Sequence, residues 1–386
     1  MRIMVLTDDQ VGRAMAGSAL RAWELARALD AAGHTVRVAA AAGSVQPDGH
    51  GPEVVAFPPW RWSEALVAPP WRLPPRAFIG DHLLIVDGVT PLLAELDAMP
   101  PSTDLLRRRR RAAARLPLVA ARADAVLIAG EEQAAWWAHQ LRPGVPLLEV
   151  PFGIPDNDPA PEYDQIAGVP EDWSVVLWWG GVWPWLDLET LLAARARLGR
   201  ARISLVVPTA DRPGTAHTRF SREDLLSAAR RHDLRAPQVV ALEDWIPYAE
   251  RHRVLNRSSL LAVLHQPGAE AELSFRTRAL DGVWARVPLL LSEGGTVARI
   301  AREQGWGGVV RPGDPATVAA ALDLMLTDRE QHRCRSALDA TRRDWRWSMV
   351  TGELTSALPE LPAIPRNALA PAAVRAAVAL KRRRHE

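Results

Sequence analysis

The amino-acid sequence predicts an α/β protein built from two doubly wound domains that face each other across a cleft. Short apolar, β-branched runs alternate with helical stripes through both halves of the chain, which is typical of parallel sheets covered by helices. A polar stretch with several prolines, 155–168, separates the halves as a linker would. The 386 residues, 48% hydrophobic and 24% charged, suffice for two ordinary domains. We expect domains at 1–155 and 156–345, then a C-terminal extension at 346–386 with a basic amphipathic tail.

The first domain opens with a β–loop–α–β unit. Residues 2–6 form a short apolar run followed by Asp8, as expected of a buried strand. Residues 19–32 carry one apolar helical stripe that ends at Gly33, and 34–41 is the next strand. The elements expected after these are strands at 82–87, 125–129 and 147–150, and helices at 104–116, ending before Pro117, and 131–141. Sheets of this kind bind ligands at the carboxyl ends of their strands.

One segment, 58–76, breaks the alternation. It holds six prolines and three tryptophans, which predicts an extended, stiff loop on the first domain. Exposed Trp60, Trp62 and Trp71 would offer flat apolar faces to a ligand. The alternative is that these rings pin the loop onto the domain surface.

The second domain repeats the alternation of strands and helices. The strands expected are 174–179, 203–207, 239–242, 260–265, 288–292 and 308–310. The helices expected are 187–198, 222–232, 248–258, 275–285, 296–304 and 315–326. A second doubly wound sheet follows from this order.

Composition excludes several classes of protein. The only lysine is Lys381, in the tail, which argues against pyridoxal enzymes, Walker-A NTPases and protein kinases, because each needs an ammonium group inside the fold. The only cysteine, Cys334, excludes a disulfide framework and multi-cysteine metal sites. The net charge of +2 is too small to indicate a nucleic-acid binder, and no metal-ligand spacing is present.

The sequence also bears on location. No apolar run approaches the ~20 residues that span a bilayer, and the N-terminal segment turns acidic at Asp8, unlike a signal peptide, so we expect a cytoplasmic protein. Two arginine runs, 107–111 and 382–384, are either solvated helix faces or surfaces that dock on an anionic membrane.

The strongest chemical signal is the segment 270–281, EAELSFRTRALD. We expect Ser274 to cap a helix whose first turn carries Arg276 and Arg278. A helix N-terminus with two added guanidinium groups is an electropositive receptor for a diphosphate, and Asp281 is placed to accept hydrogen bonds from a ribose diol. The alternative is a helix with surface ion pairs.

Two glycine-containing turns add weaker signals. Gly12, in the loop after the first strand, precedes a helix N-terminus that suits a phosphate, although a plain βα turn is as good an explanation. Gly180 and Gly181, in WWGGVWPWLD, permit close approach of the backbone to a ligand. Trp183 and Trp185 in the same loop suit stacking on a sugar or base, or packing in the core.

These residues together resemble the GT-B glycosyltransferases of the large retaining family 4, from Met1 to about Trp347. The resemblance rests on the opening strand, loop and RAWELARAL helix, the VPFGIP junction at 150–155, the glycine turn, and ELSFRTRALD followed by WARVP and EGG. Aligned on Phe275 and Pro288, the second family glutamate becomes Asp281, and the first falls at Leu273, beside Glu272.

The chain departs from that family at two positions. Where the family has an arginine and a lysine that grip the donor diphosphate, this sequence has Val182 and Asp187. Arg276 and Arg278 would supply the missing positive charge. The WGG…W-D turn and the SFRTR helix resemble a bacterial subgroup of the family.

The resemblance implies a metal-independent, retaining enzyme that transfers a sugar, as a hexosyltransferase does, from a nucleotide-diphosphate sugar to an acceptor hydroxyl, with no cofactor. Its setting would be polysaccharide, glycoconjugate or natural-product biosynthesis. It places the donor on the second domain and a small-molecule, saccharide or lipid-linked acceptor on the first, near Trp60, Trp62 and Trp71. The donor-binding residues it implies are Gly12, Gly180, Gly181, His265, Ser274, Phe275, Arg276, Arg278 and Asp281. Asp87 and Glu272 are the catalytic candidates, with His82 a weaker one.

Two alternatives stay open. A pseudo-glycosyltransferase or sugar-nucleotide epimerase on the same fold is compatible with the altered diphosphate residues. A non-catalytic protein that keeps the fold as a scaffold is the third possibility, and nucleotide binding separates it from the other two.

Overall fold

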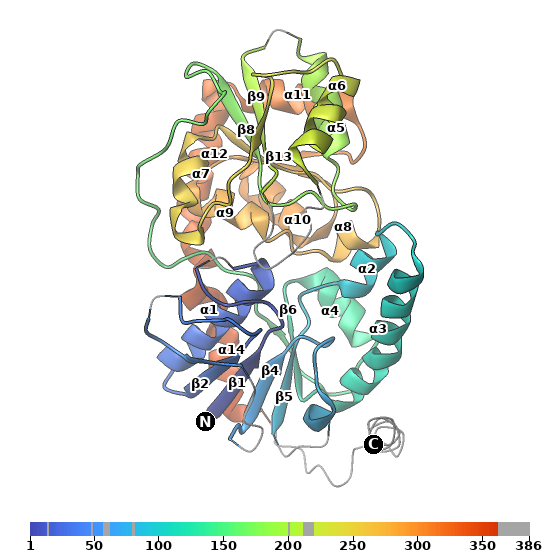
Figure 1. Ribbon diagram of the computed structural model, residues 1–386. Helices are drawn as coiled ribbons and strands as arrows, with labels where there is room; N and C mark the ends of the chain where they lie inside the picture. Colours follow the sequence, from blue (N-terminus) through green and yellow to red (C-terminus); the bar gives the residue numbers. More distant parts are fainter. Residues whose placement is uncertain are drawn as a thin grey trace. The chain divides into compact units, whose positions relative to one another are not determined.

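The computed structural model describes residues 1–13, 15–47, 49–56, 62–78, 82–199, 201–210 and 220–361 (Figure 1). Its contacts divide the chain into two compact units. The first unit holds Met1–Asp97, Pro101–Phe152 and the chain from Trp347 on, and the second holds Ala98–Pro100 and Gly153–Arg346. The second unit is therefore an insertion within the first.

A seven-stranded parallel sheet, in the order β3-β2-β1-β4-β5-β6-β7, forms the middle of the first unit. The strands are β1 (Arg2–Leu6), β2 (Thr35–Ala39), β3 (Glu53–Val55), β4 (Ala65–Ala68), β5 (Leu83–Asp87), β6 (Ala125–Ile128) and β7 (Leu147–Glu149). The central strands are buried on both faces, which is why they are continuous apolar runs rather than alternating ones.

Helices cover both faces of this sheet (Figure 1). On one face, α1 (Gly17–Ala31) and α14 (Gly352–Ala357) share a core with β1 and β2, and α13 (Trp347–Val350) packs on α1. On the other face, α3 (Thr103–Arg122) and α4 (Glu131–Ala138) contribute Leu116, Val119 and Trp137 to a second core, with α2 (Leu92–Asp97) beside α3.

The second unit contains a six-stranded parallel sheet in the order β10-β9-β8-β11-β12-β13. The strands are β8 (Ser174–Trp178), β9 (Ile203–Pro208), β10 (Val239–Leu242), β11 (Leu260–Val263), β12 (Leu289–Ser292) and β13 (Gly307–Val310). This confirms the predicted fold class of two doubly wound α/β units.

The helices of the second unit form two groups (Figure 1). In one, α5 (Leu188–Arg197), α6 (Arg222–Arg231) and α11 (Pro315–Met325) share an apolar core with β8, β9 and β11. In the other, α7 (His252–Arg257) packs on α9 (Arg278–Ala285), α9 packs on β11, and α10 (Gly295–Gln304) packs on β12 and on α12 (Asp328–Thr341). The short helix α8 (Ala269–Leu273) lies against α10.

The prediction of a loop at 58–76 is wrong for part of that segment. Residues Ala65–Ala68 form β4, which is fully buried and lies between β1 and β5 at the centre of the sheet. The strand was missed because a four-residue apolar run followed at once by Pro69-Pro70, in a segment that begins with Pro58-Pro59, resembles a loop.

The predicted end of a helix before Pro117 is also wrong. Helix α3 continues through Pro117 to Arg122. Proline removes one backbone hydrogen bond and costs about 3 kcal/mol in a helix interior. Leu116, Val119 and Ala120, buried on either side of it, hold the last two turns against the sheet and outweigh that cost.

The described part of the extension predicted from 346 on belongs to the first unit. Leu354 and Leu358 enter the core beneath α1, and the predicted basic tail at 370–384 lies outside the described residues. The chain passes from the first unit to the second at 152–153 and returns at 346–347, and contacts inside each unit join the residues at these two points. Within the second unit, the Ile154 amide donates to the Trp345 carbonyl at 2.7 Å. Within the first unit, the rings of Phe152 and Trp347 lie 4.9 Å apart.

Candidate functional site

The residues singled out in the second unit gather at the carboxyl ends of three adjacent strands. The turn 179–181 follows β8, His265 follows β11, and Gly294 and Gly295 follow β12. Carboxyl ends of parallel strands are where doubly wound sheets bind ligands.

The expectation that Ser274 caps a helix running from 275 to 285 is wrong. Ser274 directly follows α8, which ends at Leu273, and α9 begins four residues later at Arg278, with Thr277 before its first turn. Between the two helices Arg276 has a φ of +20°, which breaks the helical path. The sequence predicted one helix because the break depends on buried tertiary contacts of Glu270 and Arg276 that helical periodicity does not report.

Arg276 lies in the interior rather than at an open helix terminus. It is 2% exposed, and its guanidinium donates to the carbonyls of Ser292, Glu293 (3.0 Å) and Ala271 (3.3 Å). Burial lowers the pKa of Arg276 to about 10. Its donors join the segment between α8 and α9 to the end of β12, so Arg276 fixes the loop.

Arg278 is the more open of the two arginines. It opens α9, is half-buried, and donates from Nη1 to the Gly181 carbonyl at 3.0 Å. Gly180 has a φ of +81°, which favours glycine, whereas a Cβ there would make only ordinary contact with the Arg278 guanidinium carbon at 3.5 Å. Burial lowers the pKa of Arg278 to about 10, which leaves the group charged at neutral pH.

Asp281 lies one turn further along α9. Its carboxylate accepts hydrogen bonds from Trp179 Nε1 and Arg251 Nε, each at 2.7 Å. The Asp281 side chain remains 23% exposed. Together, Arg278 and Asp281 bond to the turn 179–181 at both ends, which fixes the glycine turn against α9.

His265 and Glu270 form a buried pair below this surface. His265 Nδ1 lies 2.7 Å from Glu270 Oε2, and the residues are 2% and 4% exposed. Burial raises the pKa of Glu270 to about 7 and lowers that of His265 well below its ordinary value. A neutral imidazole beside a carboxyl group that stays protonated up to about pH 7 is the arrangement these directions favour. Phe275, also buried, stacks on Trp345 with 6.1 Å between ring centres.

Glu272 is exposed and lies beside two glycines that open α10. A Cβ on Gly294 would lie 2.8 Å from Glu272 Oε1, and one on Gly295 would lie 2.9 Å from the Ala271 carbonyl. Both glycines have positive φ, 97° and 71°. Only glycine at these positions lets the end of α8 approach the start of α10 so closely.

The two positions that depart from the family have structural explanations. Asp187 is 3% exposed and caps α5, accepting from the Thr190 amide at 3.1 Å. Val182 and Trp183 pack on the core, and Trp183 stacks on Trp185 with ring centres 5.2 Å apart. Trp178 is buried in β8, as expected of a core residue.

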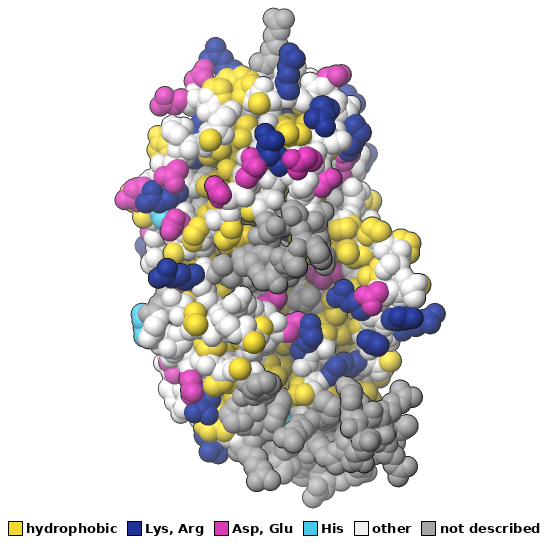
Figure 2. Space-filling model, viewed as in Figure 1, with side chains coloured by type: hydrophobic (Ala, Val, Ile, Leu, Met, Phe, Trp, Pro, Cys, Tyr) yellow, Lys and Arg dark blue, Asp and Glu magenta, His cyan; other side chains and the backbone are white. Residues whose placement is uncertain are grey.

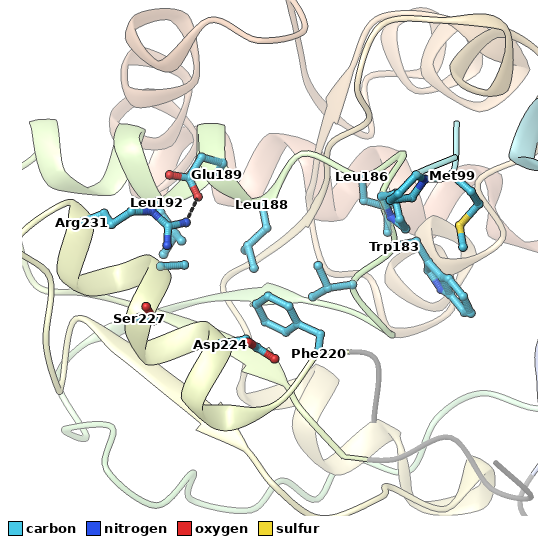
Figure 3. A pocket seen from close by; sticks show the side chains of 14 residues that line it. Met99, Trp183, Leu186, Leu188, Glu189, Leu192, Phe220, Asp224, Ser227 and Arg231 are labelled. Atoms are coloured by element: carbon cyan, nitrogen blue, oxygen red, sulfur yellow. Dashed lines mark hydrogen bonds and ion pairs between the residues drawn. The ribbon is translucent and has the colours of Figure 1, made fainter. Parts of the chain in front are cut away.

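A cavity of about 650 Å³ lies between α5, α6 and the loop that follows the glycine turn (Figure 3). Leu188, Leu192, Phe220 and Trp183 give it an apolar floor. The Glu189–Arg231 ion pair at its edge, 2.9 Å apart, is marked in Figure 3. Asp224 and Ser227 also line the cavity, and the Asp224 carboxylate accepts a hydrogen bond from the Ser221 amide, so the charged groups of the lining already have partners within the chain.

In the first unit, Asp87 lies at the carboxyl end of β5, as predicted, and its carboxylate forms an ion pair with Arg21. Both of its oxygens lie 2.9 Å from Arg21 Nε. The Arg21 guanidinium also donates to the carbonyls of Val150 (2.8 Å) and Pro151 (3.0 Å). This pair therefore ties α1 and β5 to the segment that leads out of the unit. His82 is 3% exposed and Nε2 lies 3.1 Å from the Ala77 carbonyl, as in a structural histidine.

The remaining first-unit candidates are placed as follows. Gly12 is buried, with Val45 Cγ2 3.5 Å from where a Cβ would lie. Trp62 and Trp71 are half-buried rather than exposed and pack on the first unit's core, Trp62 beneath the Arg37 guanidinium at 4.4 Å. Trp60 lies outside the described residues.

Basic side chains gather over α3 (Figure 2). Arg107, Arg108, Arg110 and Arg111 are exposed, and no described carboxylate forms an ion pair with any of them. Arg109, in contrast, pairs with Asp97. Leu106, on the same part of the helix, is 49% exposed.

Two features are absent from the described residues. Among the described residues, no group of His, Cys, Asp and Glu side chains is arranged to hold a metal ion. Nor does any described helix combine the length and apolar character that crossing a bilayer requires.

The sequence analysis did not predict a role at the site for three side chains, those of Arg21, Trp179 and Arg251. Trp179 directly precedes Gly180, so its position near the site could have been predicted from the sequence. Arg21 and Arg251 carried no signal beyond the helical or loop segments in which they lie, because nothing in a sequence pairs residues 30 or 66 positions apart.

Comparison with known proteins supports the fold. Sucrose-phosphate synthase from Thermosynechococcus elongatus superposes with a TM-score of 0.67 and 14% identity, covering 93% of this chain and 98% of that one. Anabaena HepE in complex with UDP-glucose gives 0.67 and 13%, covering 94% and 100%. WaaG, a glycosyltransferase involved in lipopolysaccharide biosynthesis, gives 0.61 and 17%, covering 94% and 98%. No protein-family model and no curated protein matches the sequence. The chain thus has the two-unit α/β fold of the GT-B class.

Proposed function

We propose that this protein is a glycosyltransferase that transfers a sugar from a nucleotide-diphosphate donor to an acceptor hydroxyl. The observation that carries the proposal is that Arg278 and Asp281 lie one turn apart on α9 and that each bonds to the glycine turn 179–181. A cation and a carboxylate one turn apart match the diphosphate and the ribose of a nucleotide. The similar Anabaena protein has UDP-glucose bound in its structure, which supports this class of donor.

Catalysis in this proposal comes from the departing diphosphate. Arg278 and the α9 N-terminus would stabilise the negative charge that develops on the leaving group. Glu272, exposed beside the start of α10, is the group we assign to the hydroxyls of the transferred sugar. We expect transfer with retention and no metal requirement, as the resemblance implies. We assign Asp87 to holding α1 and β5 together through its ion pair with Arg21, rather than to catalysis.

We further propose that the acceptor binds to the first unit, at the carboxyl end of its sheet. The packing of Trp62 and Trp71 favours a structural role for these two rings. Alanine in place of either is expected to lower the melting temperature, whereas a ring that touches the acceptor would change the acceptor KM alone.

The decisive experiment incubates the purified protein with UDP-, GDP-, ADP- and dTDP-sugars and mixed saccharide and lipid-linked acceptors. Mass spectrometry follows release of nucleoside diphosphate, the glycosylated product and any epimerised donor. Product with nucleotide release supports the proposal. Epimerised donor without release would assign an epimerase instead, and the lack of binding of every nucleotide by calorimetry would leave a scaffold protein.

We propose a second contact, between the α3 arginines and an anionic membrane, in a protein that works in the cytoplasm. Four exposed guanidinium groups that pair with no described carboxylate, beside an exposed leucine on one helix, suit an anionic lipid surface. Replacing Arg107, Arg108, Arg110 and Arg111 by glutamine should abolish co-sedimentation with vesicles containing phosphatidylglycerol. Equal binding of the wild type to neutral phosphatidylcholine vesicles would contradict an electrostatic contact.

A further inference from the structure

Asp281 is held by two neighbours that use only half of its capacity to accept hydrogen bonds. Arg251 Nε donates to Oδ1 and Trp179 Nε1 donates to Oδ2, each at 2.7 Å. A carboxylate oxygen accepts two hydrogen bonds readily, so each oxygen retains one acceptor position. The Asp281 side chain is 23% exposed and that of Arg251 is 4% exposed, so what remains accessible at this pair is the carboxylate.

Arg251 has little freedom to move. Its guanidinium carbon lies 3.6 Å from the centre of the Tyr248 ring and 4.0 Å from that of Trp284. Nη1 donates to the Tyr248 carbonyl at 2.5 Å, and Trp284 is itself fixed by a 2.8 Å hydrogen bond to the Asn157 carbonyl. Two aromatic faces and a carbonyl thus fix the plane of the guanidinium, and Nε is left aimed at Asp281.

We infer that Arg251 is a positioning residue that makes Asp281 a reader of the ribose cis-diol, which selects ribonucleoside over 2′-deoxyribonucleoside diphosphates. This inference rests on the proposed function. An ionised carboxylate fixed in plane presents two acceptors side by side, and these match two neighbouring hydroxyl donors. A 2′-deoxyribose offers one hydroxyl fewer, so it leaves one of those acceptors without a partner.

The same contacts link this reader to the rest of the site. Trp179 immediately precedes Gly180, and Arg278 donates to the Gly181 carbonyl from one turn earlier on α9. Asp281, held at a fixed angle by Arg251, therefore stands at a fixed distance from the arginine assigned to the diphosphate. Loss of the Arg251 contact frees the carboxylate to change rotamer, which weakens recognition of the ribose while Arg278 keeps its own contact.

Calorimetry with UDP and 2′-deoxy-UDP tests this directly on the full-length protein. The variant Arg251→Met keeps the length and the apolar contact with both rings but removes the donor. We expect the wild type to bind UDP about tenfold more tightly than 2′-deoxy-UDP, and the variant to lose about tenfold in UDP affinity while its affinity for 2′-deoxy-UDP stays within about twofold. Arg253→Met, in the first turn of α7, the helix that directly follows Arg251, removes an exposed ion pair with Asp164; it is the matched control and should change neither affinity.

The outcomes separate the possible failures. If Arg251→Met loses affinity for UDP and 2′-deoxy-UDP equally, Arg251 has only a structural role. If the wild type binds the two nucleotides equally well, Asp281 does not recognise the ribose 2′-hydroxyl and the inference is wrong. If Arg251→Met does not fold, Trp179→Phe removes the second donor while keeping a ring, and should narrow the preference in the same way. Should the wild type bind neither UDP nor GDP, the proposed function fails before the inference is reached.

Discussion

Arg276 and Arg278 stand two residues apart in the sequence and have different tasks. Arg276 spends its donors on three backbone carbonyls in the interior, whereas Arg278 makes one bond to the glycine turn and remains half-buried. The sequence predicted the same role for both, as ligands of the donor diphosphate. Burial is what separates them, because a guanidinium that is 2% exposed and bonded through both terminal nitrogens to backbone carbonyls is poorly accessible to a ligand.

This contrast gives a matched pair of predictions. Arg278→Ala should raise the donor KM and lower kcat with a small change in melting temperature, at a cost of about 2–3 kcal/mol in transition-state stabilisation. Arg276→Ala should chiefly lower the free energy of unfolding, by roughly 2–4 kcal/mol, because it leaves buried carbonyls without donors. Steady-state kinetics and urea unfolding measure the two effects. Equal kinetic loss in both variants at unchanged stability would restore Arg276 as a ligand.

The His265–Glu270 pair predicts an unusual dependence of stability on pH. Because the folded pKa of Glu270 is about 7, above its ordinary value, its contribution to stability falls as pH rises toward 7. His265 has a folded pKa well below its ordinary value, so its contribution rises with pH up to about 6.5. Between pH 5 and 6.5 the two slopes oppose each other and nearly cancel.

The variant Glu270→Gln removes the contribution of Glu270 to the pH dependence of stability and leaves that of His265. Its free energy of unfolding should fall below pH 6.5 by about 1 kcal/mol per pH unit relative to the wild type. Urea unfolding at pH 5, 6 and 7 measures the difference, and the remaining carboxylates contribute equally to both proteins. Parallel pH profiles would show that the pair does not titrate in this way.

At the scale of elements, strand β4 shows the limit of periodicity. Leu66 is 0% exposed and belongs to the central core, although its segment resembled a loop. Leu66→Ala should lower the free energy of unfolding by about 2–5 kcal/mol. Leu106→Ala, on the exposed side of α3, is the control and should change it by less than about 0.5 kcal/mol. Chemical denaturation compares the two, and similar small effects would argue that 65–68 is not a central strand.

The alternation of strands and helices was predictable from sequence almost throughout, because each buried strand is a compact apolar run. Helix boundaries near Ser274 and Pro117 were not, since α8 ends and α3 continues through contacts made with distant residues. The same holds for the site. Arg278 and Asp281 followed from helical spacing, whereas Arg251, 30 residues from its partner, depends on how α7 packs against α9.

At the scale of the whole molecule, the second unit is contiguous in sequence apart from Ala98–Pro100, and it has its own core. Its two ends are joined by the 2.7 Å bond between Ile154 and Trp345. Residues 153–346 expressed alone should therefore fold and bind UDP with nearly the affinity of the full chain. Calorimetry and a cooperative melting curve test this, and an unfolded fragment would show that the unit depends on the rest of the chain.

The insertion also sets the order in which the protein is completed during synthesis. The first sheet leaves the ribosome early, but the helix that closes one of its faces, with Leu354 and Leu358, is made only after the entire second unit. At ~5–20 residues per second that delay is on the order of ten seconds or more. For this time the apolar face over β1 and β2 is covered by α1 without Leu354 and Leu358, whereas the second unit can fold as soon as it emerges. The unit that begins first finishes last, and nascent chains of this protein should engage chaperones until the final helices arrive.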